Sequence, residues 1–376
     1  MRRSIDSFPI VMWLLLAAVA VLFSPDALAQ DAKFAPEKQT RLEAAIARFM
    51  SAHQIPGVSV AVVENNAVEW SAGFGMADLE NFVPATSQTL YRLASISKPI
   101  TATAALQLWQ QHKLDLDAPV QKYCPAFPEK DDTITTRQIL GHLGGIRHYK
   151  SEAEGDQELG NTRHFDDTIQ AGLNFFKNDP LVAKPGSAFH YSTQGFTLVG
   201  CTVEGASGEK YVDYVQKNVL QPAGMLHTRT DDRCAIIPNR TRFYQKAKSG
   251  DIQNADFLDS SYKVAGGGWL SSADDMAQFI VALLNDRLLQ RSTRDLMWAP
   301  LQTSDGKGTG YALGWGTGNN LGTPNVGHDG GQQGTSTSIL IVPERKAGVV
   351  VLMNLEHADP SALATELMKT LLGIAK

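Results

Sequence analysis

The sequence contains few of the features that mark metal-binding, nucleic-acid-binding or membrane-spanning proteins. Its 376 residues include three cysteines and nine histidines, and none shows the Cys-x-x-Cys, His-x-His or His-Glu-x-x-His spacing that predicts a zinc site. A net charge of −5 without a dense basic run leaves nucleic-acid binding without electrostatic support. No Gly-x-Ser-x-Gly is present, which argues against an α/β-hydrolase. We therefore expect no metal, no organic cofactor and no nucleic-acid partner.

The one long apolar run lies within the first 29 residues, which have the pattern of a secretory signal peptide. Arg2-Arg3 forms a basic start, residues 10–23 an apolar core, and Ala27-Leu28-Ala29 a small-residue cleavage site. A permanent membrane anchor is the alternative, but the short apolar run and the Ala-x-Ala that follows it favour cleavage near Ala29. The sequence therefore predicts a periplasmic or secreted protein without a stable membrane anchor.

The three cysteines cannot all pair within one chain. In an oxidising compartment one disulfide is possible among Cys124, Cys201 and Cys234, although a chain of this length can build a core without one. Cys201 lies in an apolar run, so we expect it to be simply buried.

Strand patterns occur at both ends of the chain, with mainly helical patterns between them. The expected helices are 37–53, 101–111, 135–143, 166–176, 196–206, 211–220, 272–284 and 360–372, and the expected strands are 58–63, 67–74, 311–316, 325–328, 336–342 and 347–353. We predict one α/β (α+β) domain over residues 30–376. Its antiparallel sheet, flanked by helices, is built from about 37–113 and 265–376, with a mainly helical insertion at about 114–264.

The stretch from Leu90 to Ile100 carries the strongest chemical signal. Ser95 and Lys98 lie three residues apart, on one face of a helix that starts at or near Ser95. A serine hydroxyl becomes a good nucleophile when a neighbouring base takes its proton, and an amine one turn away can do so. The helix N-terminus lowers the lysine pKa and offers free N–H groups to a developing oxyanion.

This spacing occurs four times, so its context must distinguish the occurrences. They are Ser95/Lys98, Ser207/Lys210, Ser260/Lys263 and Ser304/Lys307. The second and fourth lie in glycine-containing turn sequences, and the third is soon followed by Gly266-Gly267-Gly268, a poor helix context. Only Ser95 introduces a sustained helix, so we select it as the candidate nucleophile.

Two later motifs complete a possible acyl-transfer site. The first is Tyr191 in a Phe-His-Tyr-Ser-Thr segment, and the second is His328-Asp329-Gly330-Gly331 on an expected strand edge. Serine acyl transfer needs a nucleophile, a proton shuttle and oxyanion donors. Here Ser95 would attack, Lys98 and Tyr191 would share the proton transfer, and the Gly331 N–H would join the Ser95 N–H at the oxyanion.

This order of motifs resembles the serine β-lactamase-like superfamily, which includes class C β-lactamases, D-Ala-D-Ala carboxypeptidases and related esterases. The resemblance is greatest to the branch of mitochondrial serine β-lactamase-like proteases. It covers nearly the whole mature chain, in segments 73–75, 82–98, 138–149, 185–195, 265–276 and 311–316. It implies an acyl-enzyme on Ser95, Lys98 as proton acceptor, and Tyr191 as a general base whose phenol proton is kept away by nearby positive charge.

Two positions depart from the pattern that recognises penicillins. The middle motif ends in Thr193 instead of asparagine, so one hydroxyl replaces an amide with separate donor and acceptor groups. The third motif, often Lys-Thr-Gly, reads His328-Asp329-Gly330; a histidine is mostly neutral near pH 7, and Asp329 adds negative charge. Thr193, His328, Gly330 and Gly331 form the expected substrate-binding and oxyanion set. Since both changes weaken the site for a β-lactam carboxylate, we predict a peptidase or esterase with poor β-lactam turnover.

Several alternatives remain open at this point. The protein could be a true β-lactamase or D,D-carboxypeptidase, a non-catalytic penicillin-binding-like sensor, or a protein whose main role is polymerisation. The expected substrates are small peptides, esters or amides, and their identity depends on loops such as 151–161 and 303–309. We expect His142 and His148, which lie within the matching segments, to have structural roles.

Overall fold

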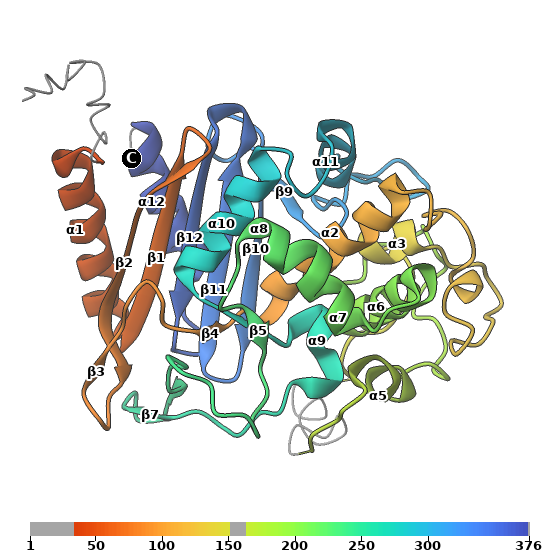
Figure 1. The fold of residues 1–376 in the computed structure, drawn as a ribbon, viewed down its shortest axis with the longest axis horizontal. Coiled ribbons are helices and arrows are strands. Elements are labelled where there is room, and N and C mark those ends of the chain that lie inside the picture. Colours follow the sequence, from red (N-terminus) through yellow and green to blue (C-terminus); the bar gives the residue numbers. More distant parts are fainter. Residues whose placement is uncertain (1–33, 151–162, 375–376) are drawn as a thin grey trace, which may run out of the picture. The chain divides into compact units, whose positions relative to one another are not determined.

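The structure, a computed structural model, describes residues 34–150 and 163–374 (Figure 1). The predicted signal peptide and the loop at 151–161 lie outside the described residues. None of the helices in the described part of the chain is long and apolar enough to cross a membrane.

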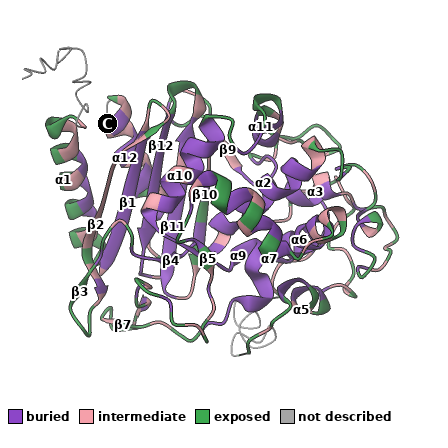
Figure 2. Ribbon diagram, viewed as in Figure 1, coloured by how far each residue is buried: buried purple, intermediate pink, exposed green. Residues whose placement is uncertain are grey.

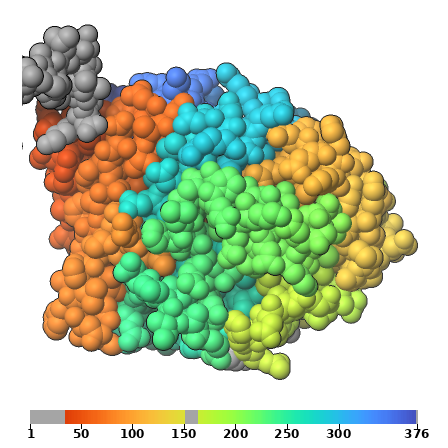
Figure 3. All heavy atoms as spheres, in the orientation of Figure 1, coloured from red at the N-terminus to blue at the C-terminus, as the bar shows by residue number. Residues whose placement is uncertain are grey.

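A seven-stranded antiparallel sheet joins the two ends of the chain, as the sequence predicts. Its strand order is β3-β2-β1-β12-β11-β10-β9, so β1, near the start of the chain, pairs with β12, near its end. Segments from the two chain ends therefore adjoin, as the orange and blue atoms in Figure 3 show. The strands are β1 (Gly57–Glu64), β2 (Ala67–Asp78), β3 (Val83–Pro84), β9 (Gly316–Gly318), β10 (Asn325–Gln332), β11 (Thr335–Val342) and β12 (Ala347–Met353).

Helices cover both faces of this sheet, because its central strands bury side chains on both sides. In β12, Val349 and Val351 pack with α1 (Pro36–His53) and α12 (Pro360–Leu372). Their neighbours Val350 and Leu352 belong to the other core, together with α10 (Ala273–Leu284). The alternation follows from the two-residue period of a strand. Figure 2 shows these strands as buried.

A second group of helices lies beside the sheet. At its centre is α2 (Ser97–Gln110), which is buried along most of its length (Figure 2). The other helices are α3 (Thr136–Leu140), α5 (Thr168–Asn174), α6 (Thr193–Ser207), α7 (Tyr211–Val215), α8 (Gln221–Ala223), α9 (Val264–Gly267) and α11 (Arg291–Trp298). The short strands are β4 (Tyr91–Arg92), β5 (Arg229–Thr230), β6 (Tyr244–Lys246), β7 (Ile252–Asn254) and β8 (Trp269–Ser271).

Several expected elements differ in the structure. The predicted strand 311–316 is a bent segment with one isolated bridge, and β9 begins only at Gly316. Gly314 interrupts it, with a φ of +82° that favours glycine. The expected break around Gly266 contains a 3₁₀ helix, η5 (Ser261–Lys263), followed by α9. The predicted helix 211–220 becomes a π-helix, η4, from Gln216.

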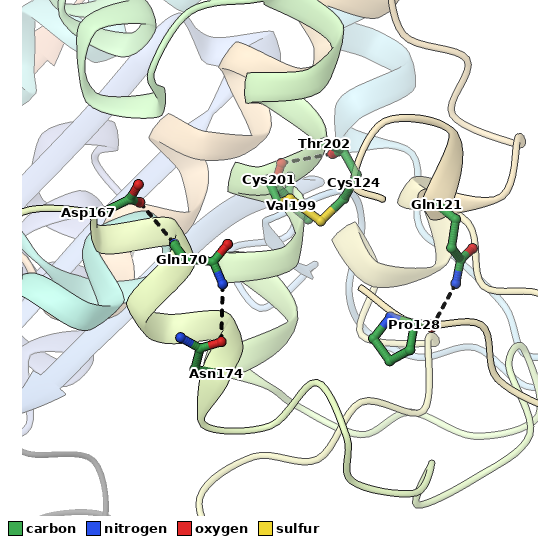
Figure 4. The surroundings of a disulfide bond; sticks show 9 residues. All are labelled: Gln121, Cys124, Pro128, Asp167, Gln170, Asn174, Val199, Cys201 and Thr202. Atoms are coloured by element: carbon green, nitrogen blue, oxygen red, sulfur yellow. Dashed lines mark hydrogen bonds between the residues drawn. A yellow bond between two sulfur atoms is a disulfide. The ribbon is translucent and has the colours of Figure 1, made fainter. Parts of the chain in front are cut away.

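The expectation that Cys201 is simply buried was wrong, because Cys124 and Cys201 form a disulfide (Figure 4). Cys201 lies on α6, which packs against the segment that contains Cys124. A Cβ at Gly205, one turn further along α6, would collide with the backbone of Tyr123. This close packing brings the two cysteine Cα atoms to 5.4 Å, within the range of disulfides. The third cysteine, Cys234, is exposed and free.

Candidate active site

Ser95 lies in a 3₁₀ turn, η2 (Ala94–Ile96), that leads directly into α2, which confirms the predicted helix start. The turn is conformationally restricted: Ala94 has a φ of +48°, a left-handed conformation that costs energy for a residue with a Cβ. Hydrogen bonds hold the preceding Leu93. Its N–H donates to the Trp269 carbonyl at 2.8 Å, and its carbonyl accepts from the Thr337 hydroxyl at 2.9 Å. β8 and β11 thus fix the position of Ser95.

The Lys98 amine lies beside the Ser95 hydroxyl and is completely buried. Its Nζ is 2.9 Å from Ser95 Oγ, 2.7 Å from the Gly266 carbonyl oxygen and 3.3 Å from Thr193 Oγ1. Burial, and secondarily the positive charge of Lys263, holds the pKa of Lys98 well below 10.5. A neutral amine can donate its two N–H groups to Gly266 and Thr193. Its lone pair then faces the Ser95 hydroxyl.

Tyr191 contacts both members of this pair. Its ring centroid is 4.8 Å from Lys98 Nζ, and its hydroxyl forms a hydrogen bond with Ser95. Burial raises the pKa of Tyr191, and the hydrogen bond offsets this effect only in part. Burial thus favours the protonated phenol in the free site, and no positive charge offsets it among the causes of the shift. The role of Tyr191 as a general base stays a prediction.

Two buried histidines hold the Tyr-Ser-Thr segment in place. The Ser192 N–H donates to His142 Nδ1 at 3.1 Å, and the Thr193 N–H donates to His148 Nδ1 at 3.2 Å. Burial lowers the pKa of both imidazoles, that of His148 to about 4, so each stays neutral and can accept. These contacts agree with the structural roles expected for the two histidines.

His328 lies on β10 and points toward Tyr311, which the sequence analysis did not select as a site residue. The Asp329 carbonyl, 2.7 Å from His328 Nδ1, can only accept, so Nδ1 carries the proton. His328 Nε2 therefore accepts from the Tyr311 hydroxyl at 2.8 Å. Burial, the largest cause, lowers the pKa of His328 to about 3. The histidine of the third motif is thus neutral.

A cavity of about 740 Å³ lies in front of Ser95. Of the predicted site residues, Ser95, Tyr191, Thr193, Gly330 and Gly331 line it. His328 instead borders an adjoining cavity of about 470 Å³, which shares Tyr191 and Asp329 with the first. β9 pairs with β10 only at 325–327, and the space where a Gly331 side chain would stand is open. The oxyanion role of the Gly331 N–H stays a prediction.

Lys263, which was not among the predicted site residues, also lines the Ser95 cavity, from η5. The signal was present, since Lys263 belongs to one of the four Ser-x-x-Lys pairs. It was set aside because a glycine triplet follows. Lys263 lies one turn before Gly266, whose carbonyl accepts from Lys98.

Among the described residues, one group could hold a metal ion: His164, Asp232 and Cys234 place their ligand atoms within 4.8 Å of one another. His164 and Asp232 line a separate cavity of about 460 Å³, and none of the three borders the cavity of Ser95. This group is therefore separate from the residues that line the Ser95 cavity.

Comparison with known proteins identifies the family. The sequence pattern of the family described as Beta-lactamase matches residues 42–371, which includes every predicted site residue. The chain belongs to the beta-lactamase family. The serine beta-lactamase-like protein LACTB, mitochondrial, of Homo sapiens is 34% identical over 379 residues, which cover 77% of this chain and 69% of the relative.

Solved structures support this family assignment and the predicted fold. The octameric penicillin-binding protein homologue from Pyrococcus abyssi has a TM-score of 0.77 at 28% identity, covering 89% of this chain and 77% of that one. A D-stereospecific amidohydrolase from Streptomyces sp. has a TM-score of 0.73 at 25% identity, covering 90% and 98%. The predicted antiparallel sheet flanked by helices is confirmed, and the protein is a β-lactamase-like serine hydrolase.

Proposed function

We propose that the protein forms an acyl-enzyme on Ser95 and hydrolyses amide or ester bonds of small peptides, amides or esters. One observation carries this proposal: the Ser95 hydroxyl lies 2.9 Å from the fully buried Lys98 amine, whose pKa is held well below its usual value. An amine that is neutral at physiological pH can accept the serine proton, whereas an ammonium cannot. This supports Lys98, rather than Tyr191, as the base for acylation.

In the acylation step, Ser95 Oγ attacks the substrate carbonyl carbon while its proton passes to Lys98 Nζ. The Ser95 and Gly331 N–H groups would stabilise the oxyanion. When the carbon–nitrogen or carbon–oxygen bond breaks, the leaving atom takes the Tyr191 phenol proton, and the proton on Lys98 restores Tyr191. Water then adds to the acyl-enzyme with the proton transfers in reverse. The net reaction is hydrolysis to a carboxylic acid and an amine or alcohol.

We expect β-lactam turnover to be poor. The pKa of His328 is about 3, so the third motif offers a neutral imidazole, already bonded to Tyr311, where a cation would bind a carboxylate. The adjacent Asp329 lines the cavity and would repel such a group. Efficient nitrocefin hydrolysis that disappears in Ser95→Ala would overturn this preference for a peptidase or esterase.

A non-catalytic penicillin-binding-like sensor is the second candidate, supported by the similarity to a penicillin-binding protein homologue. A sensor and a hydrolase would both be acylated at Ser95, but only the hydrolase would release the acyl group rapidly. Labelling with a fluorescent penicillin, followed by measurement of label loss, separates the two functions.

For the location, we propose export to the periplasm or the exterior. The N-terminal pattern supports this, and so does the Cys124–Cys201 disulfide, because structural disulfides persist mainly in oxidising compartments. The human relative is described as mitochondrial. Fractionation of the native host, with N-terminal sequencing of the mature protein, tests the proposal.

A library of peptides, amides and esters, screened against the wild-type protein and Ser95→Ala, is the central experiment. The proposal expects hydrolysis of at least one class by the wild type and none by the variant. A fluorophosphonate probe should label the wild type at Ser95 and leave the variant unlabelled. Hydrolysis that persists in Ser95→Ala would contradict the assigned nucleophile.

A further inference from the structure

Lys263 is a nearly buried cation at the wall of the Ser95 cavity. The residue is only 7% exposed, and it lines the cavity. It comes from η5, which continues into α9, the helix that supplies the Gly266 carbonyl to Lys98. One short segment thus positions the candidate base and presents a second lysine to the substrate space.

The surroundings of Lys263 do not neutralise its charge. In the part of the chain that the structure describes, no carboxylate forms an ion pair with it. Its Nζ lies over the rings of Tyr149 and Tyr262, 5.8 and 5.4 Å from their centroids. Cation–π contacts of this kind attract the ammonium but leave its N–H donors without acceptors.

The two buried arginines among the described residues are paired. Arg92, also 7% exposed, donates to the Asp231 carboxylate at 2.7 Å, and Arg294, 8% exposed, pairs with Asp286 at 2.6 Å. Burying an unpaired charge is unfavourable, so natural proteins rarely retain one without a function. Lys263 is the exception among these three, and it is the one that lines the cavity of the candidate nucleophile.

We propose that Lys263 binds an anionic group of the substrate, a carboxylate, and so selects negatively charged substrates. The proposal rests on the proposed hydrolase function and identifies the class of substrate. Charge-assisted hydrogen bonds from an ammonium to a carboxylate are strong in a partly desolvated site. The rings of Tyr149 and Tyr262, which also line the cavity, would exclude water from this contact.

The other charges of the cavity restrict where the anion can lie. The carboxylates of Asp256, Asp329 and Glu356 also line the cavity, and each comes from a segment other than η5. They would repel a negative group placed near them. A substrate with one carboxylate is therefore oriented by Lys263, with its uncharged part toward the acidic residues.

The experiment compares esters that differ in charge, on either side of the scissile bond. On the acyl side, 4-nitrophenyl glutarate monoester is compared with 4-nitrophenyl valerate. On the leaving-group side, 3-acetoxybenzoate is compared with phenyl acetate. The wild type should prefer the charged member of at least one pair by about tenfold or more in kcat/KM. Lys263→Met should remove this preference, mainly through KM.

Two further variants separate charge recognition from other effects. Lys263→Arg keeps a cation and should retain much of the preference. Lys217→Met removes an exposed lysine that pairs with Glu209, outside the residues that line the cavity, and should behave as wild type. Each variant is assayed on the pH plateau of its own profile, so that a change in the pKa of Lys98 does not contribute.

The result that overturns the inference is distinct from failure of the hydrolase proposal. If Ser95-dependent hydrolysis shows no preference for charge, or the preference survives in Lys263→Met, Lys263 does not select the substrate although the function stands. If no ester is hydrolysed, calorimetry with Ser95→Ala still measures binding of the charged and neutral esters. Tighter binding of a charged ester that is lost in Ser95→Ala/Lys263→Met supports the inference, and equal binding overturns it.

Discussion

Replacing Lys98 by methionine should greatly reduce activity and, at neutral pH, stabilise the fold. Activity should fall by a factor of about 10² to 10⁴, the usual contribution of a general base. Stability should rise because the wild-type amine, completely buried, has a pKa held well below its unfolded value near 10.4. Methionine fills a similar volume with no group to desolvate.

The pH dependence of this stabilisation gives the sharper test. A lysine with a lowered folded pKa makes the folded state bind fewer protons than the unfolded state. Wild-type stability, relative to Lys98→Met, should therefore rise by about 1.4 kcal/mol per pH unit between the folded and unfolded pKa values of Lys98. Below the folded pKa the full penalty persists. The advantage of Lys98→Met is thus greatest at low pH and shrinks as the pH rises toward 10.

Lost hydrogen bonds oppose this gain. Without the Lys98 amine, the buried Gly266 carbonyl loses its donor at 2.7 Å, which costs about 1–3 kcal/mol. Lys98→Met is therefore more stable than the wild type at neutral pH only if the pKa of Lys98 in the folded protein is lowered by at least about two units.

Urea denaturation, followed by circular dichroism at several pH values from 6 to 9.5, measures the difference in free energy of unfolding. Lys217→Met, which removes an exposed lysine, is the matched control and should show a difference that does not change with pH. A difference between wild type and Lys98→Met that is equally independent of pH would refute the assignment of a neutral, buried amine. Lower stability of Lys98→Met at pH 6 would refute the expected sign.

Three other outcomes follow from the same structure. Tyr191→Phe should slow amide hydrolysis by about 10²-fold or more but affect 4-nitrophenyl esters much less, because a nitrophenolate leaves without a proton. Measurement of kcat/KM for matched amide and ester substrates tests this. Equal losses for the two substrates would contradict the role of Tyr191 as proton donor. Lys263→Met should move the acidic limb of the plot of kcat/KM against pH to higher pH, because loss of the Lys263 charge raises the pKa of Lys98. An acidic limb at the same pH as in the wild type would contradict that coupling. The double variant Cys124→Ala/Cys201→Ala should lower the free energy of unfolding by about 4.5 kcal/mol, the loop-closure value for a separation of 77 residues. Urea denaturation of both proteins, with and without reductant, checks this, and equal stability without reductant would contradict it.

The Ser95–Lys98 pair could be predicted because its signal is local. Three residues of spacing and the start of a sustained helix place the two side chains together, and no distant contact is needed to infer it. The strands of the sheet were recognisable for a similar reason, since alternation along β12 follows directly from the sequence. The order of the three motifs then indicated the serine β-lactamase-like superfamily, and that resemblance predicted the fold.

Spacing drew attention to Lys263, but its place beside the Ser95 cavity could not be predicted because that position depends on distant contacts. A glycine triplet does not favour a helix, yet α9 forms because side chains of α2 satisfy its carbonyls. Thr101 donates to the Ala265 carbonyl at 2.6 Å, and Lys98 donates to that of Gly266 at 2.7 Å. Tertiary hydrogen bonds thus determined a structure that local propensity opposed.

The raised pKa of Tyr191 and the Cys124–Cys201 disulfide could not be predicted for a related reason. The pKa of Tyr191 depends on how completely other elements exclude water from its hydroxyl, and sequence spacing does not report that. The two cysteines are 77 residues apart, so their pairing depends on the packing of α6 against the segment of Cys124.

The hydrogen bonds around the Ser95 turn have a consequence for synthesis of the protein. Leu93 accepts from Thr337, and Arg92 accepts through its carbonyl from Thr335 at 3.0 Å, across separations of 244 and 243 residues. A ribosome must therefore translate most of the chain before these contacts can form. A nascent or truncated chain that ends before β11 has the serine and the lysine but lacks the strand that fixes their turn. Hydrolytic activity should thus appear only after β11 has been synthesised, which would spare the compartment of synthesis from an exposed nucleophile.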